Sequence, residues 1–283
     1  MRASCLCGEV VWEASSPSAV SHCHCSMCRK SHGSSFATYA LVPAASFRVV
    51  KGAEHVRPFQ SSAEVRRAFC GRCGSVVPAQ PAEAAGEHGI VPLGPVEGDP
   101  GVRPQLHIFW GSRAPWLALE DGLPRFDAFP PGMDAPVLPS RQLPPAPAGR
   151  VRGSCLCGEV AYEMETAQLR MRHCHCLRCR RARSAAHATN VFGPRAAVQF
   201  VHGESQLRSY KLPEARYFTQ VFCETCGSPM PRLDPERDLA VAPSGSLDDD
   251  PGVRAECHIF VADKAPWFEI RDDVPRHDQG APL

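Results

Sequence analysis

The sequence lacks an excess of charge of either sign. Its 31 lysine and arginine residues are balanced by 30 aspartate and glutamate residues. A chain this close to neutral has no global field of the kind that attracts nucleic acid or an anionic membrane. We therefore expect a small-molecule or protein partner rather than nucleic acid.

Long apolar runs are also missing. No stretch approaches the length needed to span a bilayer, and the segment after Met1 has no apolar region typical of a secretory signal. These absences predict a protein without membrane association, located in the cytoplasm.

A 3.6-residue hydrophobic period is absent as well. The apolar runs are short, rich in β-branched and aromatic residues, and interrupted by glycine and proline, which is typical of short strands. The clearest runs are residues 10–12, 36–42, 47–50 and 106–110. The sequence predicts a mainly β protein with at most a single helical turn after Cys25 or Cys176.

Cysteine, in contrast, is abundant. The chain has 15 cysteines, an odd number, in C-x-C and C-x-x-C spacings. Without a secretory signal, such clusters indicate metal ligands more than disulfides. Fourteen fall into two matching sets of seven, and the remaining Cys257 is expected to be a small buried residue.

The two sets belong to an internal duplication. Residues 1–127 and 152–278 align along their whole length, and two repeats are too few for a solenoid. We predict two small β domains, residues 1–129 and 151–283. They are joined by residues 130–150, a linker whose seven prolines favour an extended chain.

Each set contains the pairs that are typical of a closed structural zinc site. The side chains of a C-x-C pair leave the same face of an extended chain, and a later C-x-x-C-G knuckle completes four thiolates. The predicted structural ligands are Cys5, Cys7, Cys70 and Cys73 in the first repeat and Cys155, Cys157, Cys223 and Cys226 in the second.

The other three cysteines of each set follow C-x-C-x-x-C spacing. Three ligands are one fewer than a tetrahedral zinc takes, so they predict an open position that suits an incoming thiol. A thiol bound there would lose its proton and become a nucleophile. The alternative is a second structural zinc completed by His32 or His107. The candidate catalytic ligands are Cys23, Cys25 and Cys28, and Cys174, Cys176 and Cys179, which gives up to four Zn²⁺ per chain, two per domain.

These motifs resemble the glutathione-dependent formaldehyde-activating enzyme family, also called the centromere protein V family, over both repeats nearly end to end. In the first repeat the matching elements are residues 5–8, 23–30, 69–75, 114–116 and 121–124; in the second they include residues 223–228, 245–249 and 265–267.

The resemblance implies the small mainly β fold of the Mss-four-like superfamily, with a four-cysteine structural zinc and a three-cysteine catalytic zinc. It also implies a carbon-sulfur lyase that acts on an S-hydroxymethylglutathione-like adduct of a thiol, such as glutathione, and an aldehyde. The second hypothesis, from a different class, is a non-catalytic zinc module that binds a protein or nucleic-acid partner.

The two repeats depart from the family pattern in different places. The first keeps the family loop at residues 31–36, whereas the second has lost its glycine and aromatic residue. The second keeps residues 245–249, where the first has Gly94-Pro95-Val96-Glu97-Gly98. Either one site has become structural, or each repeat supplies part of a composite site. We hypothesise that the first repeat carries the more competent zinc.

Weaker signals have less specific interpretations. A basic cluster around the second trio could hold the carboxylates of a glutathione-like ligand or offset the charge of a zinc-trithiolate. Its members are Arg178, Arg180, Arg181 and Arg183. The four tryptophans, and His107 and His258, are expected in the core or at domain edges.

Overall fold

The computed structural model describes residues 1–79, 87–133, 137–138 and 146–281. Strands dominate it, so the predicted mainly β class is confirmed. Of the predicted linker, residues 134–136 and 139–145 lie outside the described residues. No helix in these described ranges is long and apolar enough to cross a membrane.

The two halves share an element order from β1 to β7 and from β11 to β17, with one α-helix after the third strand of each. The strands of the first half are β1 (Arg2–Ser4), β2 (Val11–Glu13), β3 (Ala19–Cys23), β4 (Ala37–Pro43), β5 (Arg48–Lys51), β6 (Val56–Gln60), β7 (Arg66–Cys70), β8 (Val76–Val77), β9 (His88–Pro92) and β10 (Leu106–Ile108). Those of the second half are β11 (Arg150–Ser154), β12 (Ala161–Glu165), β13 (Arg170–Cys174), β14 (Ala188–Pro194), β15 (Val198–His202), β16 (Leu207–Lys211), β17 (Thr219–Cys223), β18 (Arg232–Asp234), β19 (Leu239–Pro243), β20 (Ala255–Ile259) and β21 (Arg276–His277).

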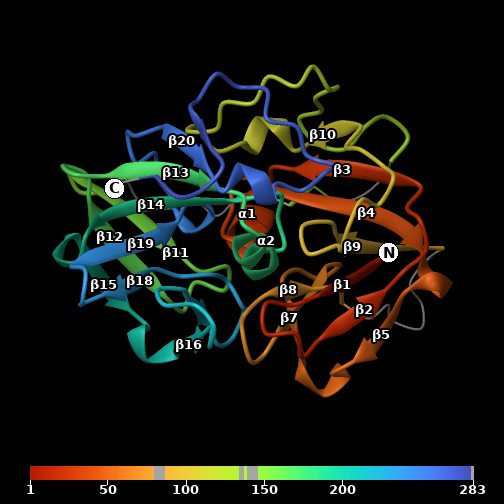
Figure 1. Ribbon diagram of the computed structural model, residues 1–283, viewed down its shortest axis with the longest axis horizontal. Coiled ribbons are helices and arrows are strands. Elements are labelled where there is room, and N and C mark those ends of the chain that lie inside the picture. Colours follow the sequence, from red (N-terminus) through yellow and green to blue (C-terminus); the bar gives the residue numbers. More distant parts are fainter. Residues whose placement is uncertain (80–86, 134–136, 139–145, 282–283) are drawn as a thin grey trace.

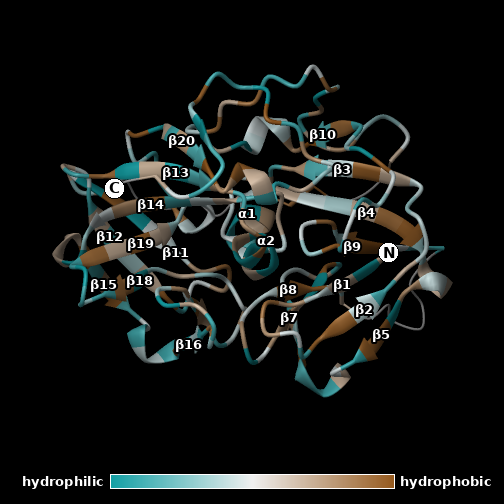
Figure 2. Ribbon diagram, viewed as in Figure 1, coloured by the Kyte–Doolittle hydropathy of each residue, from teal (hydrophilic) through white to brown (hydrophobic). Residues whose placement is uncertain are grey.

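In each half an antiparallel pair leads into the three-cysteine motif. In the first half it is β3 and β4, within a sheet of order β10-β3-β4-β9; β10 runs parallel to β3. In the second half β13 and β14 occupy the same place in a sheet of order β18-β19-β14-β13-β20-β21. Hydrophobic residues recur along the strands of both halves (Figure 2), as expected for sheets with one buried face.

The helices are longer than the single turn that the sequence predicts. Helix α1 (Ser26–His32) and helix α2 (Leu177–Arg183) each have seven residues, which is about two turns. Each begins after a cysteine whose sulfur accepts a hydrogen bond from the helix backbone, and each ends at a residue with positive φ, Gly33 or Ser184. Both helices lie at the centre of the molecule, between the halves (Figure 1).

Each half inserts a tryptophan into the core of the other. Trp116 of the first half packs among second-half residues that include Tyr162 and Met230. Trp267 of the second half packs in the core that contains Trp12 and Phe36. Both inserted tryptophans are buried, at 4% and 1% exposed. Burial of this size stabilises a core by roughly 1.5–3 kcal/mol or more per side chain, so each core depends on the other half.

Close backbone approaches fix the interface. A Cβ atom on Gly245 would lie 2.2 Å from the carbonyl oxygen of Arg29, and one on Gly94 would lie 2.2 Å from the amide nitrogen of Ala185. Only glycine permits these approaches. The first brings together the two segments that keep the family pattern, residues 31–36 and 245–249; the second brings together the two that depart from it.

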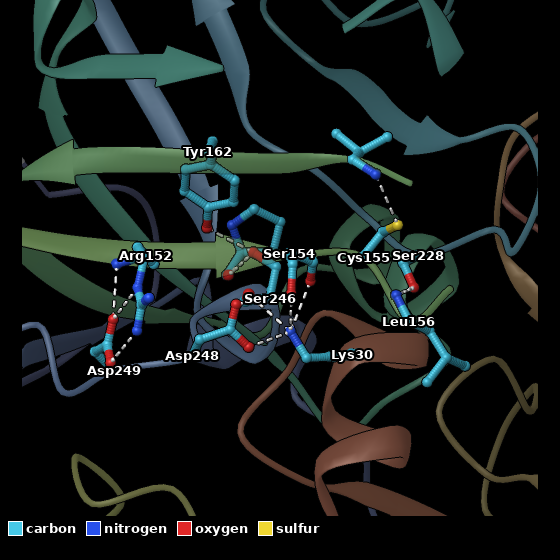
Figure 3. Close-up of polar contacts among 12 residues, drawn as sticks. Lys30, Arg152, Ser154, Cys155, Leu156, Tyr162, Ser228, Ser246, Asp248 and Asp249 are labelled. Carbon is cyan, nitrogen blue, oxygen red and sulfur yellow. Dashed lines mark hydrogen bonds and ion pairs between the residues drawn. The ribbon is translucent and has the colours of Figure 1, made fainter. Parts of the chain in front are cut away.

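The helix of the first half is anchored by a buried ion pair. Lys30 Nζ lies 2.6 Å from Asp248 Oδ1, and it donates hydrogen bonds to Ser154 Oγ and to the carbonyl oxygen of Ser154 (Figure 3). The two charged side chains are 10% and 7% exposed. At the corresponding contact on the other side, Arg181 and Glu97 are 3.4 Å apart and much more exposed.

We predict that Lys30→Met lowers the free energy of unfolding by about 3–5 kcal/mol, because it leaves the Asp248 carboxylate buried without its cation. Arg181→Met is the matched control and should cost less than about 1 kcal/mol, since its ion pair is exposed. Denaturant unfolding of both variants measures the difference; equal losses would contradict the stated asymmetry.

Candidate metal centres

Two clusters of four cysteines form where the sequence predicts structural sites. Their sulfur atoms all lie within 4.8 Å of one another. The clusters consist of Cys5, Cys7, Cys70 and Cys73, and of Cys155, Cys157, Cys223 and Cys226. Both join the first strand of a half to the turn after β7 or β17.

Local backbone geometry explains how these sulfurs converge. Gly8 and Gly74 both have positive φ, about 72° and 73°, so the chain turns tightly after each pair. The amide of Val10 donates to Cys5 Sγ at 3.3 Å, and Gly74 N donates to the carbonyl oxygen of Cys70 at 2.8 Å. The second half repeats the pattern, with Val160 N donating to Cys155 Sγ.

The three-cysteine motifs also close into clusters. Each set of three sulfurs lies within 4.8 Å. Cys23 is the last residue of β3, Cys25 precedes α1, and Cys28 N donates to Cys25 Sγ at 3.3 Å. The sulfur of Cys25 therefore caps the first turn of α1. Cys174, Cys176 and Cys179 are arranged in the same way around the start of α2.

The sulfur separations fit zinc. Cys5 and Cys7 are 3.4 Å apart, and Cys23 and Cys25 are 3.6 Å apart, sulfur to sulfur. A tetrahedral zinc with bonds of about 2.3 Å holds its sulfurs about 3.8 Å apart, whereas a disulfide requires about 2.05 Å. All four clusters could therefore hold a metal ion, and an all-thiolate donor set suits zinc.

The histidines proposed as a fourth ligand are occupied elsewhere. His32 Nδ1 binds the carbonyl oxygen of Arg183 and its Nε2 binds Tyr39 OH, both at 2.8 Å. His107 binds His24 at 2.9 Å through Nδ1 and Asp121 through Nε2. Within the described ranges, no histidine, aspartate or glutamate joins either group of three cysteines. The alternative of a zinc completed by His32 or His107 finds no support here.

A phenylalanine in an unusual backbone conformation borders each trio. Phe109 and Phe260 both have φ of 57°, a left-handed value that costs a residue with a Cβ about 1–3 kcal/mol. Phe109 packs against the cluster of Cys23, Cys25 and Cys28, beside Ile108, and Phe260 packs against the second trio. The turn places a phenylalanine ring against each cluster, and this ring limits the access of water to the sulfurs.

The other predicted residues have structural roles. The core predictions for His107 and His258 are confirmed, since they are 0% and 2% exposed, and Cys257 is also buried. Trp12, Trp116 and Trp267 are buried, while Trp110 lies at an edge beneath Arg113 and Arg125. In the basic cluster, Arg180 binds the carbonyl oxygens of Asp263 and Val96, and Arg181 binds Glu97.

Sequence reasoning missed a guanidinium beside the first trio. Arg67 donates to Cys28 Sγ at 3.5 Å, although it lies 39 positions further along the chain. Burial alone would lower the pKa of Arg67, but the negative charges of Cys28, Tyr39 and Cys25 together outweigh burial and raise that pKa. A position-by-position comparison of the two repeats could have drawn attention to Arg67, because the repeats differ there. Arg67 on β7 pairs with Phe59, whereas at the same register of the second half Gln220 pairs with Tyr210.

The chain matches a family model described as glutathione-dependent formaldehyde-activating enzyme over residues 1–112 and again over residues 150–263. It is also similar to a solved crystal structure of a Rhodobacter sphaeroides protein at 28% identity, over 35% of this chain and 89% of that chain, with a TM-score of 0.30.

We predict that Cys70→Ser removes one zinc per chain and lowers the free energy of unfolding by more than about 3 kcal/mol, because a closed four-thiolate site contributes directly to folding. Cys257→Ala is the matched control, a buried cysteine outside the clusters that should leave the metal content unchanged. Metal analysis and denaturant unfolding test both. Full metal content and wild-type stability in Cys70→Ser would contradict the assignment.

Proposed function

The chain belongs to the glutathione-dependent formaldehyde-activating enzyme family, and from this premise we propose that it is a zinc-dependent carbon-sulfur lyase acting on a thiol-aldehyde adduct. The observation that carries the proposal is the three-thiol cluster of Cys23, Cys25 and Cys28, which lacks a fourth protein ligand in the described part of the chain. The substrate class is an S-hydroxymethylglutathione-like adduct, with glutathione as the thiol.

The reaction needs an ionised thiol held at a fixed place. A zinc ion bound by the three cysteines would lower the pKa of a thiol that fills the remaining position. In the direction of adduct formation, the thiol sulfur bonds to the aldehyde carbon and the carbonyl π pair moves to the aldehyde oxygen. The proton lost by the thiol then binds to this oxygen, which becomes the hydroxyl of the adduct. No oxidant or reductant is required, and the reverse direction is the lyase reaction.

The residues around the first trio suit this chemistry. Cys25 is partly exposed, whereas Cys23 and Cys28 are buried, so a ligand can approach from the side of Cys25. Ile108 and Phe109 pack against the cluster and exclude water from its flank. The protein supplies position and charge, which are what a thiol addition requires.

The interface supports a composite site. The family loop at residues 31–36 belongs to the first half, and the segment packed onto it, residues 245–249, belongs to the second. Ser35 Oγ lies 3.2 Å from Ser244 Oγ, and Ser34 Oγ donates to the carbonyl oxygen of His187. The first trio therefore lies beside both segments that retain the family pattern.

The alternative, a binding module without catalysis, draws less support. A nucleic-acid partner would use the arginines around the second trio, but Arg180 and Arg181 already bind the first half.

We predict that Cys23→Ala lowers the thiol-aldehyde exchange rate more than about 100-fold, because it removes a ligand from the working centre. Cys174→Ala, the matched variant in the second half, should keep most of the activity. NMR exchange between formaldehyde and its glutathione adduct, measured at equilibrium, gives the rate. Loss of activity only in Cys174→Ala would reverse the assignment, and a wild-type rate equal to the uncatalysed one would favour the binding module.

A further inference from the structure

The sulfur of Cys28 has a charged partner that is itself held in place. Arg67 directs one Nη atom to Cys28 Sγ, its other Nη atom donates to Tyr39 OH at 3.3 Å, and its Nε donates to Ser61 Oγ at 3.1 Å. Every branch of the guanidinium is therefore engaged. Such a guanidinium keeps its orientation, so its charge stays beside the sulfur.

The chain of hydrogen bonds continues into the other half of the molecule. The carbonyl oxygen of Arg183 can only accept, so His32 Nδ1 carries the proton. Burial lowers the pKa of His32 to about 4, so the ring is neutral and its Nε2 accepts from Tyr39 OH. The oxygen of Tyr39 then accepts from Arg67. The second half thereby contributes, through His32 and Tyr39, to holding the guanidinium at the first trio.

The same positions around the second trio hold different residues. Gln220 replaces Arg67, Asn190 replaces Tyr39, and Arg183 replaces His32, in matching registers of the paired strands and helices. Their buried atoms Gln220 Nε2, Asn190 Oδ1 and one Nη of Arg183 have no hydrogen-bond partner in the described part of the chain. Among the residues that the structure describes, no chain of hydrogen-bond donors like that of the first half leads to Cys179.

Arg183 is a buried cation, but its situation differs from that of Arg67. Burial lowers the pKa of Arg183 to about 10, and the Cys179 thiolate only partly offsets this. Among the described residues no hydrogen bond joins Arg183 to Cys179 Sγ. The second trio thus has several positive charges nearby, since Arg232 also lies near Cys179 and Arg178 near Cys176. In the described part of the chain, none of these guanidiniums donates a hydrogen bond to a sulfur of the trio.

Access to the two trios also differs. Phe218 packs against Cys174, Cys176 and Cys179, and Cys176 is only 4% exposed. The residue of the first half that precedes β7, as Phe218 precedes β17, is Val65, and it is 37% exposed. Cys25 is thus partly exposed, whereas its counterpart Cys176 is buried.

We propose that Arg67 is a positioning residue for the anionic thiol at the first trio, and that thiol binding is confined to that trio. This inference rests on the proposed function. Three thiolates and one Zn²⁺ carry a net charge of −1, and a fourth thiolate brings it to −2, so an adjacent guanidinium favours the bound thiolate. Gln220, in the place of Arg67, carries no charge, and the guanidiniums near the second trio make no hydrogen bond to its sulfurs among the described residues. Phe218 packs against that trio as well.

The test uses the full chain with cobalt(II) in place of zinc, titrated with glutathione. A sulfur ligand entering the open position increases the sulfur-to-cobalt charge-transfer absorption. We expect a response in wild type and in Cys174→Ala but not in Cys23→Ala. Arg67→Gln should weaken the apparent glutathione affinity about 10- to 100-fold, and Arg67→Lys should restore part of the loss. Arg66→Gln, an exposed neighbour on the same strand, should have no effect.

Three results would overturn the inference. One is wild-type affinity in Arg67→Gln; another is equal loss of affinity in Arg67→Gln and Arg66→Gln; the third is a response that survives Cys23→Ala. A positioning role is distinguished from lost structure by three measurements on each variant: cobalt content, the ligand-field spectrum before titration, and thermal unfolding. If Arg67→Gln does not fold, Arg67→Lys takes its place in the test. A wild-type protein that gives no response at all would overturn the proposed function as well. The first two results leave the proposed function standing, whereas the third would move the thiol site away from the first trio.

Discussion

The exchange of tryptophans between the halves is the constraint on which the rest of the structure depends. With Trp116 in the core of the second half and Trp267 in the core of the first, neither sheet system can bury its apolar face alone. The halves are therefore held at one relative position. Because α1 and α2 lie along that contact, the chain segments that carry the cysteine trios are fixed by it too.

The contact is symmetric in outline and asymmetric in detail. Gly94 and Gly245 make equivalent close approaches, but the ion pair of Lys30 and Asp248 is buried while that of Arg181 and Glu97 is partly exposed. A buried pair holds its geometry more strictly than an exposed one. The helix that follows Cys25 is therefore more firmly positioned than its counterpart, which matches the ordered environment of Cys28.

Much of this could be predicted from the sequence because it depends on local spacing. C-x-C and C-x-x-C pairs bring sulfurs together through one turn of backbone, so the four cysteine clusters follow from spacing and repetition. The short strands follow from β-branched runs. The length of the two helices could not be predicted in the same way, because they have no apolar period. The length of α1 depends instead on Cys25 at its start and Gly33 at its end.

The features that could not be predicted depend on long-range contacts. Nothing near Arg67 in the sequence indicates Cys28 as its partner, and nothing near Trp116 indicates that it crosses to the other half. The contrasting patterns at residues 31–36 and 245–249 did suggest a composite site, but only the fold shows that these two segments meet.

The covalent link between the halves has a consequence for how such a protein can diverge. In a symmetric pair of identical chains every substitution appears in both subunits at once, so a change harmful at one centre is harmful at two. Here the codon for Arg67 and the codon for Gln220 are separate. Fusion thus permits one copy to lose its chemistry while it is kept for the support it gives the other.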